Sequence, residues 1–308
     1  MNVFVDFKQL KEGYEEFRNY PFNLERGIEM KRKKLILCFI GAVLLMTGCG
    51  GEASLPVYSN LSEEQVREQF ETELIQAGAA ETDAQKSMAI VKEYNDSIQN
   101  TSLVEEGYAS FDMTMPEYDI DAIQDLWMKK NPDFIGYNCR ITAFGLMKDL
   151  IMVQDMGGRN TEYLFLDEAA LDAGELFTAE EREKFETVFS EIKTDASTDT
   201  KKQIGVQREY WKKAGVTFDE ESKLSLITVY LHSHIDENEN SLIAGHAGVL
   251  LDTGNEILFF EKISFELPYQ LIRFEDRNQL KEYLMRCYDV DTTGECASPF
   301  ILENDRVL

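Results

Sequence analysis

The sequence predicts an α+β protein in which a group of helices precedes an antiparallel sheet. Apolar residues recur at helical spacing in separate stretches from residue 61 to Trp211. From Lys223 the period changes to two, and β-branched and aromatic residues become frequent, which is typical of strands. The 308 residues, 44% of them hydrophobic, are enough for one large or two modest domains with an apolar core.

Six helices are predicted in the first part of this region. They cover residues 61–78, 83–94, 119–131, 138–153 and 178–192, and a further stretch that reaches Trp211. Capping boxes predict two of the starts, because a hydroxyl and a side chain three residues later can satisfy the free amides of a first turn. Ser62 with Gln65 forms one box, and Thr178 with Glu181 forms the other.

The strands follow. Residues 223–235 alternate and predict one strand, and residues 246–265 predict a hairpin that turns at "DTGN". "PYQLIRF" (268–274) adds a short strand, and residues 276–288 predict a closing helix with Asp276 as its cap.

The N-terminal region carries a targeting pattern. Four basic residues, 31–34, precede an apolar run over 35–46, which is shorter than the roughly 20 residues of a transmembrane helix and fits the core of a secretion signal. "MTGC" then resembles a bacterial lipobox, although Met46 replaces the usual leucine. The resemblance implies that Cys49 is lipidated and holds the protein outside the cell at the cytoplasmic membrane.

The organisation expected from this pattern has four parts. Residues 1–29 are an extension ahead of the true start at Met30, residues 30–48 a lipoprotein signal peptide, and residues 49–56 a tether. Residues 57–308 form a single globular α+β domain. The net charge of −26 makes nucleic acid and anionic membrane surfaces unsuitable partners. The acidic residues are spread along the chain and predict a solvated surface.

Three of the five cysteines remain after Cys38 in the signal and Cys49 at the lipobox are set aside. Cys287 and Cys296 are close enough in sequence to form a disulfide or to stay reduced, and this choice is open. Cys139 is the expected free thiol. It lies in "GYNCRITAFGLMKD", at the predicted first turn of a helix, where the helix dipole favours the thiolate.

A base for this thiol must come from three histidines, His232, His234 and His246. If Thr253 and Gly254 form a two-residue turn, Asp252 pairs with Asn255 and His246 faces Glu261 across the hairpin. Opposed residues of an antiparallel pair point to the same face, so Glu261 could orient the imidazole. A slip of one residue would move Glu261 to the other face, and Asn255 and Gln270 are substitutes for its role.

A cysteine at a helix start, a histidine at the head of the strand "HAGVLL" and a polar residue on the next strand resemble papain-like peptidases of the NlpC type. The resemblance implies a papain-like thiol hydrolase arrangement that needs no cofactor and acts on peptide or cell-wall amides. Cys139 would be the nucleophile, His246 the general base and Glu261 the orienting acid. The sequence departs from that family in Asn138 and Arg140, and in an insertion over 157–223 between cysteine and histidine.

A second resemblance spans nearly all of the domain. "YSNL", "CRITAF", "GHAGVLL", "FFEKISFELPYQ" and "PFILEND" are similar to a group of bacterial lipoproteins, domain-of-unknown-function family 4300. This resemblance implies a lipoprotein architecture and carries no chemistry.

Other interpretations of the same residues stay open. Cys139 can be a small buried apolar residue, which makes the protein a non-catalytic lipoprotein that binds a ligand or partner. Arg140 can bind a substrate carboxylate or cover its helix with its stem, and Gln270 can line a pocket. His232, His234 and His246 can form a three-histidine metal site with an open position.

Overall fold

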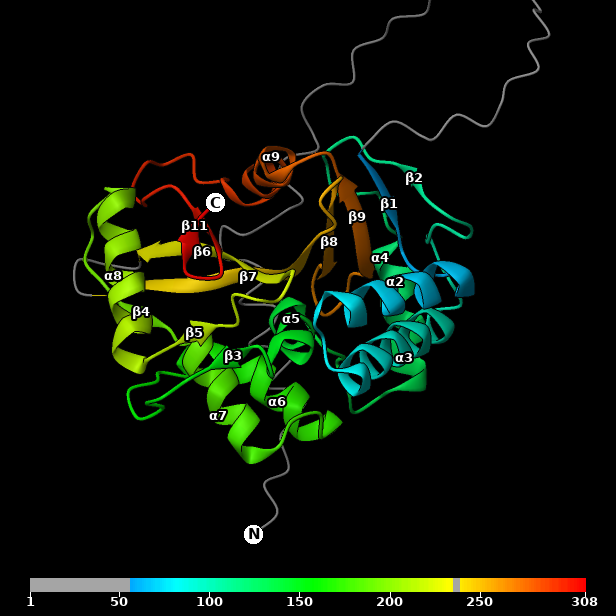
Figure 1. Cartoon of the computed structure of the whole chain (residues 1–308), viewed down its shortest axis with the longest axis horizontal. Helices are drawn as coiled ribbons and strands as arrows, with labels where there is room; N and C mark the ends of the chain where they lie inside the picture. Colours follow the sequence, from blue (N-terminus) through cyan, green and yellow to red (C-terminus); the bar gives the residue numbers. More distant parts are fainter. Residues whose placement is uncertain (1–55, 235–238) are drawn as a thin grey trace, which may run out of the picture. The chain divides into compact units, whose positions relative to one another are not determined.

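The computed structural model describes residues 56–234 and 239–308 (Figure 1). The predicted start extension, signal peptide, lipidation site Cys49 and most of the tether lie outside the described residues. The described part contains eight α-helices and a nine-stranded antiparallel sheet, which confirms the predicted α+β class. None of its helices has the length and apolar composition needed to cross a membrane.

The helices mostly follow the predicted order. Their bounds are α2 (Glu64–Ala77), α3 (Glu81–Ser97), α4 (Ile120–Lys130), α5 (Cys139–Met147), α6 (Phe165–Gly174), α7 (Ala179–Val188), α8 (Thr200–Ala214) and α9 (Arg277–Tyr288). The capping box of Thr178 and Glu181 at α7 is confirmed, and Asp276 caps α9 by accepting two backbone N–H groups.

The capping box predicted at Ser62 is wrong. Helix α2 starts one residue later than that box requires, after Glu63, whose side chain makes no capping hydrogen bond. Leu61 adopts a left-handed backbone with φ of 58°, and the guanidinium of Arg67 donates to the carbonyls of Leu61 and Ser62. This turn directs the chain into the helix without a hydroxyl cap.

Two further helix predictions need correction. Helix α5 ends at Met147 instead of Val153, because Ile151–Met152 (β3) pairs with Thr217–Phe218 (β5) in a separate two-stranded sheet. Helix α6 was not predicted at all. It lies within the stretch interpreted as an insertion, and it supplies a residue next to the site described below.

The large sheet joins segments that are far apart in the sequence. Its order is β11-β10-β6-β7-β8-β9-β1-β2, with β4 also paired to β7. The strand bounds are β1 (Val57–Ser59), β2 (Ala109–Ser110), β4 (Ile192–Lys193), β6 (Leu224–His234), β7 (Asn240–Asp252), β8 (Ile257–Lys262), β9 (Tyr269–Phe274), β10 (Phe300–Glu303) and β11 (Arg306–Val307). Strand β1 comes from the start of the domain and pairs with β9, while β10 from its end pairs with β6.

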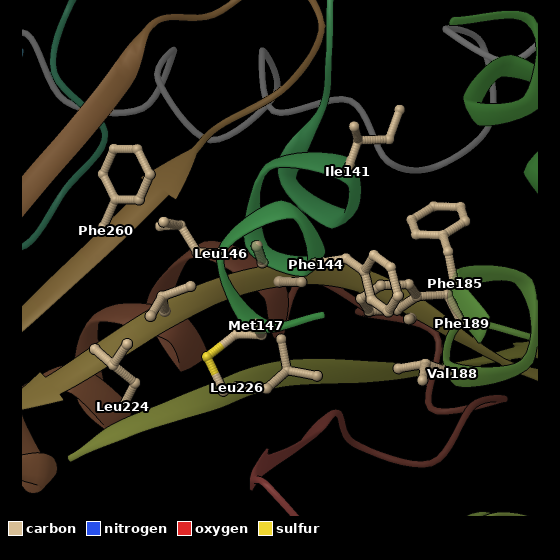
Figure 2. Close-up of a cluster of buried hydrophobic side chains, with 14 of the residues drawn as sticks. Ile141, Phe144, Leu146, Met147, Phe185, Val188, Phe189, Leu224, Leu226 and Phe260 are labelled. Atoms are coloured by element: carbon tan, nitrogen blue, oxygen red, sulfur yellow. The ribbon is translucent and has the colours of Figure 1, made fainter. Parts of the chain in front are cut away.

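Helices cover both faces of the sheet. On one face α5 packs against β6, β7 and β8, and Figure 2 shows Phe144 of α5 directed toward Phe185 of α7 and Phe189, which follows α7. The Phe144 and Phe185 ring centroids are 5.6 Å apart. The opposite face is covered by α9 through an apolar cluster that includes Leu280 and Tyr283. Successive side chains of a central strand therefore point alternately toward the α5 layer and the α9 layer.

Candidate active site

The β7–β8 hairpin has a four-residue loop, which corrects the predicted register. Asp252 pairs with Ile257 instead of Asn255. The loop is closed by Thr253, whose N–H donates to the carbonyl of Glu256 at 3.2 Å. The error shifts the pairing by two residues, and side chains alternate with a period of two. Glu261 therefore stays on the face that was predicted for it, although it is not directly opposite His246.

A β-bulge and a divergence of strands position His246. Val229 of β6 pairs with His246 and the next residue, Tyr230, pairs with Ala244, so Gly245 is the extra residue of the bulge. A Cβ at Gly245 would lie 2.0 Å from Cδ1 of Leu231, so a side chain fits there only if Leu231 moves. Pairing between β7 and β8 ends at Val249. Beyond that point the two strands separate, and His246 has room to contact groups other than its strand neighbour.

The imidazole of His246 is fixed by a buried carboxylate. Its Nε2 lies 2.5 Å from Oε2 of Glu261, and Oε1 of Glu261 accepts a hydrogen bond of 2.6 Å from the hydroxyl of Tyr283 on α9. His246 and Glu261 have exposed fractions of 0% and 1%. The ring of Tyr288 stacks on the imidazole with centroids 4.9 Å apart, and Phe259 contacts the imidazole edge-on. The ring orientation is therefore determined by a carboxylate and by aromatic packing.

Cys139 is the first residue of α5 and lies beside this histidine. Asn138 caps the helix by accepting the N–H of Ile141 at 3.0 Å. The buried Nδ1 of His246 makes no hydrogen bond to nitrogen or oxygen, so it is the ring nitrogen left for the thiol. No hydrogen bond joins Nδ1 of His246 to the thiol of Cys139 in this structure. The two groups are nevertheless close enough that each shifts the pKa of the other.

The two pKa shifts favour a thiolate and an imidazolium. Burial raises the pKa of Cys139, but His246, the charge of Arg140 and the N–H of Ala247 together outweigh burial and leave this pKa below its ordinary value. Burial also lowers the pKa of His246, whereas the thiolate of Cys139 and the carboxylate of Glu261 raise it to about 9. Transfer of the proton from sulfur to nitrogen is the chemistry that a thiol nucleophile needs.

Other titratable groups surround the thiol from several elements. Arg140, Lys262, Tyr163 and Tyr288 all interact electrostatically with Cys139. Lys262 is buried on the α5 face, where its Nζ lies 3.6 Å from the ring centroid of Tyr94. Burial holds the pKa of Lys262 well below its ordinary value, which reduces the positive charge that it places near the thiol.

The structure places Arg140 and Gln270 in buried positions. Arg140 is 7% exposed, and its guanidinium binds Asp167 of α6. Gln270 is paired with Glu261 across β8 and β9, and its Nε2 donates to the hydroxyl of Tyr118 at 2.6 Å. Since β9 lies on the far side of β8 from β7, Gln270 lies behind Glu261 with respect to His246.

The three histidines do not converge on one site. His232 and His234 lie on β6 in phase with Leu226 and Tyr230, which belong to the α5 layer, whereas His246 faces the α9 layer. The Nδ1 of His232 accepts the N–H of Ala297 at 3.0 Å. Within residues 56–234 and 239–308, no three His, Cys, Asp or Glu side chains are placed to hold a metal ion. The described residues therefore do not bring His232, His234 and His246 together, as the three-histidine alternative requires.

The cysteines of the described part are all free thiols. Cys287 and Cys296, for which a disulfide was one option, are unbridged and partly exposed. Burial and the carboxylate of Glu261 raise the pKa of Cys287 to about 12, and burial also raises the pKa of Cys296. Of the three thiols, only Cys139 has its pKa lowered.

Sequence reasoning missed three residues of this site. Tyr283 and Tyr288 lie on the predicted closing helix five residues apart, a spacing that does not place them on one helical face. Asp167 lies on the unpredicted helix α6, and nothing in the sequence connects it to Arg140. The contact could be found only by knowing how α6 packs.

The comparison with protein families finds a match over residues 57–308 to the model described as "Domain of unknown function (DUF4300)". The chain belongs to the DUF4300 family. No curated protein and no solved structure matches the chain significantly. The chemistry of this DUF4300 member must therefore be inferred from its own residues.

Proposed function

We propose that this DUF4300 protein is a cysteine-dependent hydrolase that cleaves peptide or cell-wall amide bonds. The observation that carries the proposal is the buried series Cys139, His246 and Glu261, in which a helix-start thiol, an imidazole and a carboxylate lie in sequence. A stable fold does not require a histidine with a raised pKa next to a cysteine with a lowered one. Such opposed shifts are concentrated at functional sites.

The proposed reaction uses each of these groups once. The thiolate of Cys139 attacks the carbonyl carbon of the amide, and the carbon–oxygen double bond opens to an oxyanion. The N–H of Cys139 at the first position of α5 is free of intrahelical bonding and can donate to this oxyanion. The imidazolium of His246 then gives its proton to the leaving amine as the carbon–nitrogen bond breaks, which leaves a thioester.

Water completes the cycle. Neutral His246 removes a proton from a water molecule, the hydroxide attacks the thioester, and the carbon–sulfur bond breaks to return the thiolate and release a carboxylic acid. Glu261 does not react. It holds the tautomer and stabilises the imidazolium, as the acid of a triad does. The chain order and the packing of the cysteine helix on the histidine strand also support a papain-like arrangement.

Substrate access requires a movement at the surface. Cys139 is 5% exposed, and Tyr288 covers the imidazole beside it. Tyr288 is only half-buried and lies at the last residue of α9, where a helix end frays at low cost. Displacement of this ring exposes the thiol and the imidazole together.

The test is modification of the folded full chain with iodoacetamide, located by peptide mass spectrometry. Cys139 should react faster at pH 7 than Cys287 and Cys296, although both of these are more exposed. This order of reactivity should be seen in the folded protein without denaturant. The variant Cys296→Ser is the matched control. Reaction of Cys139 only after denaturation would refute the proposal. In parallel, wild-type protein should release new amino groups from peptidoglycan or peptides, and Cys139→Ser should not.

The second candidate is a non-catalytic lipoprotein that binds a ligand or partner. The closed site favours this second candidate, because two surface depressions in the described part of the chain are lined by residues other than Cys139 and His246. One is between α3 and α5 and includes Thr142 and Tyr269, and the other is at the β7–β8 turn and includes Thr253 and Arg277. Slow labelling of Cys139 in the native protein, together with intact cell-envelope phenotypes of Cys139→Ala, is the outcome this candidate predicts.

We also propose that the protein is anchored by lipid at Cys49 on the outer face of the cytoplasmic membrane. The basic, apolar and "MTGC" segments of the sequence support this location. Metabolic labelling with a fatty acid should mark the wild-type protein and not Cys49→Ser. Label that persists in this variant would contradict the anchor.

A further inference from the structure

Arg140 lies directly after the proposed nucleophile, and its side chain is enclosed by three elements. Its Nε and Nη2 donate to the two carboxylate oxygens of Asp167 at 2.9 and 2.6 Å. Its Nη1 donates to the backbone carbonyl of Ala244 at 2.9 Å. The guanidinium therefore connects the start of α5 with α6 and with β7 in one rigid fork.

The carbonyl that Arg140 binds is close to the proposed base. Ala244 immediately precedes Gly245, the extra residue of the bulge that determines the position of His246. One side chain thus connects the residue after the nucleophile to the backbone two residues before the base. No backbone hydrogen bond of a strand ladder can do this, because Cys139 lies on a helix.

Asp167 also holds the helix start from the other side. Its Oδ1 accepts a hydrogen bond of 2.8 Å from the side-chain Nδ2 of Asn138. The Oδ1 of the same Asn138 side chain caps α5 by accepting the N–H of Ile141. Asp167 is fully buried. Residues on both sides of Cys139 are therefore attached to the same carboxylate, which restricts rotation and translation of the first turn.

Stability alone does not explain this ion pair. Removing two charges from water is expensive, and well-packed apolar residues are often as stabilising as a buried pair. The pair instead provides defined geometry, which a guanidinium and a carboxylate supply through two parallel hydrogen bonds. Geometry is what a nucleophile and a base need, because misplacement by about 1 Å can reduce catalysis by about 100-fold.

We propose that Arg140, held by Asp167, is a positioning residue that sets the distance between the thiol of Cys139 and the imidazole of His246. This inference rests on the proposed hydrolase function. It assigns Arg140 a role toward the catalytic pair instead of toward a substrate carboxylate.

The decisive variant is Arg140→Lys, which keeps the positive charge near the thiol but loses the fork. Histidine side chains labelled with ¹⁵N can be titrated by NMR in the full chain, which contains three histidines. In the wild type, His246 should titrate at about pH 9, because the thiolate is beside it. In Arg140→Lys the His246 pKa should fall toward its ordinary value, and alkylation of Cys139 at pH 7 should slow at least tenfold.

Asp167→Asn separates positioning from simple electrostatics. Loss of a negative charge near the thiol would by itself favour the thiolate and speed alkylation. Loss of positioning should slow alkylation instead, as in Arg140→Lys. Faster alkylation in Asp167→Asn with an unchanged His246 titration would overturn the inference.

Arg277→Lys is the matched control. Arg277 makes the same kind of fork, with Nε and Nη2 on Glu303 at 2.7 Å each and Nη1 on Asp252 at 2.7 Å. It begins α9, at the opposite end of that helix from Tyr288. This control should leave the His246 titration and the alkylation rate unchanged.

The outcomes separate this inference from the proposed function. If wild-type Cys139 is unreactive at pH 7 while His246 still responds to Arg140→Lys, positioning stands and the hydrolase proposal fails. If wild-type Cys139 is reactive and Arg140→Lys changes neither readout, the hydrolase proposal stands and the positioning role is refuted. If Arg140→Lys unfolds, which equal labelling of Cys139, Cys287 and Cys296 would reveal, the comparison is made with Asp167→Asn.

Discussion

The contact between His246 and Glu261 gives the sharpest quantitative prediction. Glu261→Gln keeps the shape of the side chain and an oxygen that can accept from Nε2, but removes the negative charge. The pKa of His246 is raised from its ordinary 6.5 to about 9, which corresponds to about 3 kcal/mol in favour of the imidazolium.

Glu261 supplies only part of this preference, because the thiolate of Cys139 contributes more. A hydrogen bond to a charged group contributes about 1.5–3 kcal/mol. Glu261→Gln should therefore lower the His246 pKa by about one to two units. The sign is fixed by charge, since a carboxylate stabilises the imidazolium and a neutral amide does not.

The assay is the titration of ¹⁵N-labelled histidine side chains between pH 5 and 10. His246 is identified by the signal lost in His246→Gln. Glu256→Gln is the control, because Glu256 lies on the same hairpin but binds Arg273. A wild-type His246 that titrates near 6.5, or a Glu261→Gln variant that titrates with the wild type, would show that the carboxylate does not act on the imidazole.

Three further predictions concern the surroundings of the site. Tyr288→Ala should increase the iodoacetamide rate at Cys139 several-fold by removing the ring that covers the imidazole, and an unchanged rate would exclude Tyr288 as a cover. Tyr283→Phe leaves a buried carboxylate oxygen without its donor and should reduce the free energy of unfolding by about 1–3 kcal/mol in urea denaturation. Gly245→Ala places a Cβ against Leu231 and should destabilise by about 1–3 kcal/mol, whereas a wild-type urea midpoint would mean that the bulge relaxes freely.

Much of the fold could be predicted because local patterns are strong. The two-residue period of β6, the capping box of α7 and the Asp276 cap each arise from neighbouring residues. Strands β1 and β10 were not predicted, because each is short and is defined by a partner more than 60 residues away. Pairing over such distances leaves no local signal.

The site was predictable in part for a similar reason. Glu261 was predicted on the correct face of the sheet despite the incorrect turn length. The pairing was wrong by two residues, and side chains alternate with a period of two. The bulge at Gly245 and the link from Arg140 to Asp167 depend on packing between elements, and the sequence gives no periodic signal for either. Chemistry along one hairpin could be inferred, whereas chemistry between separate elements required the structure.

The way the sheet uses both ends of the domain has a consequence for the nascent protein. Strand β10, at residues 300–303, flanks β6, and β6 pairs with β7 at the bulge that positions His246. A chain still lacking its last ten residues has β6 as an unprotected edge, and such long-range pairing forms slowly. A chain synthesised only as far as residue 298 therefore already contains Cys139 and His246 but lacks the strand that borders β6.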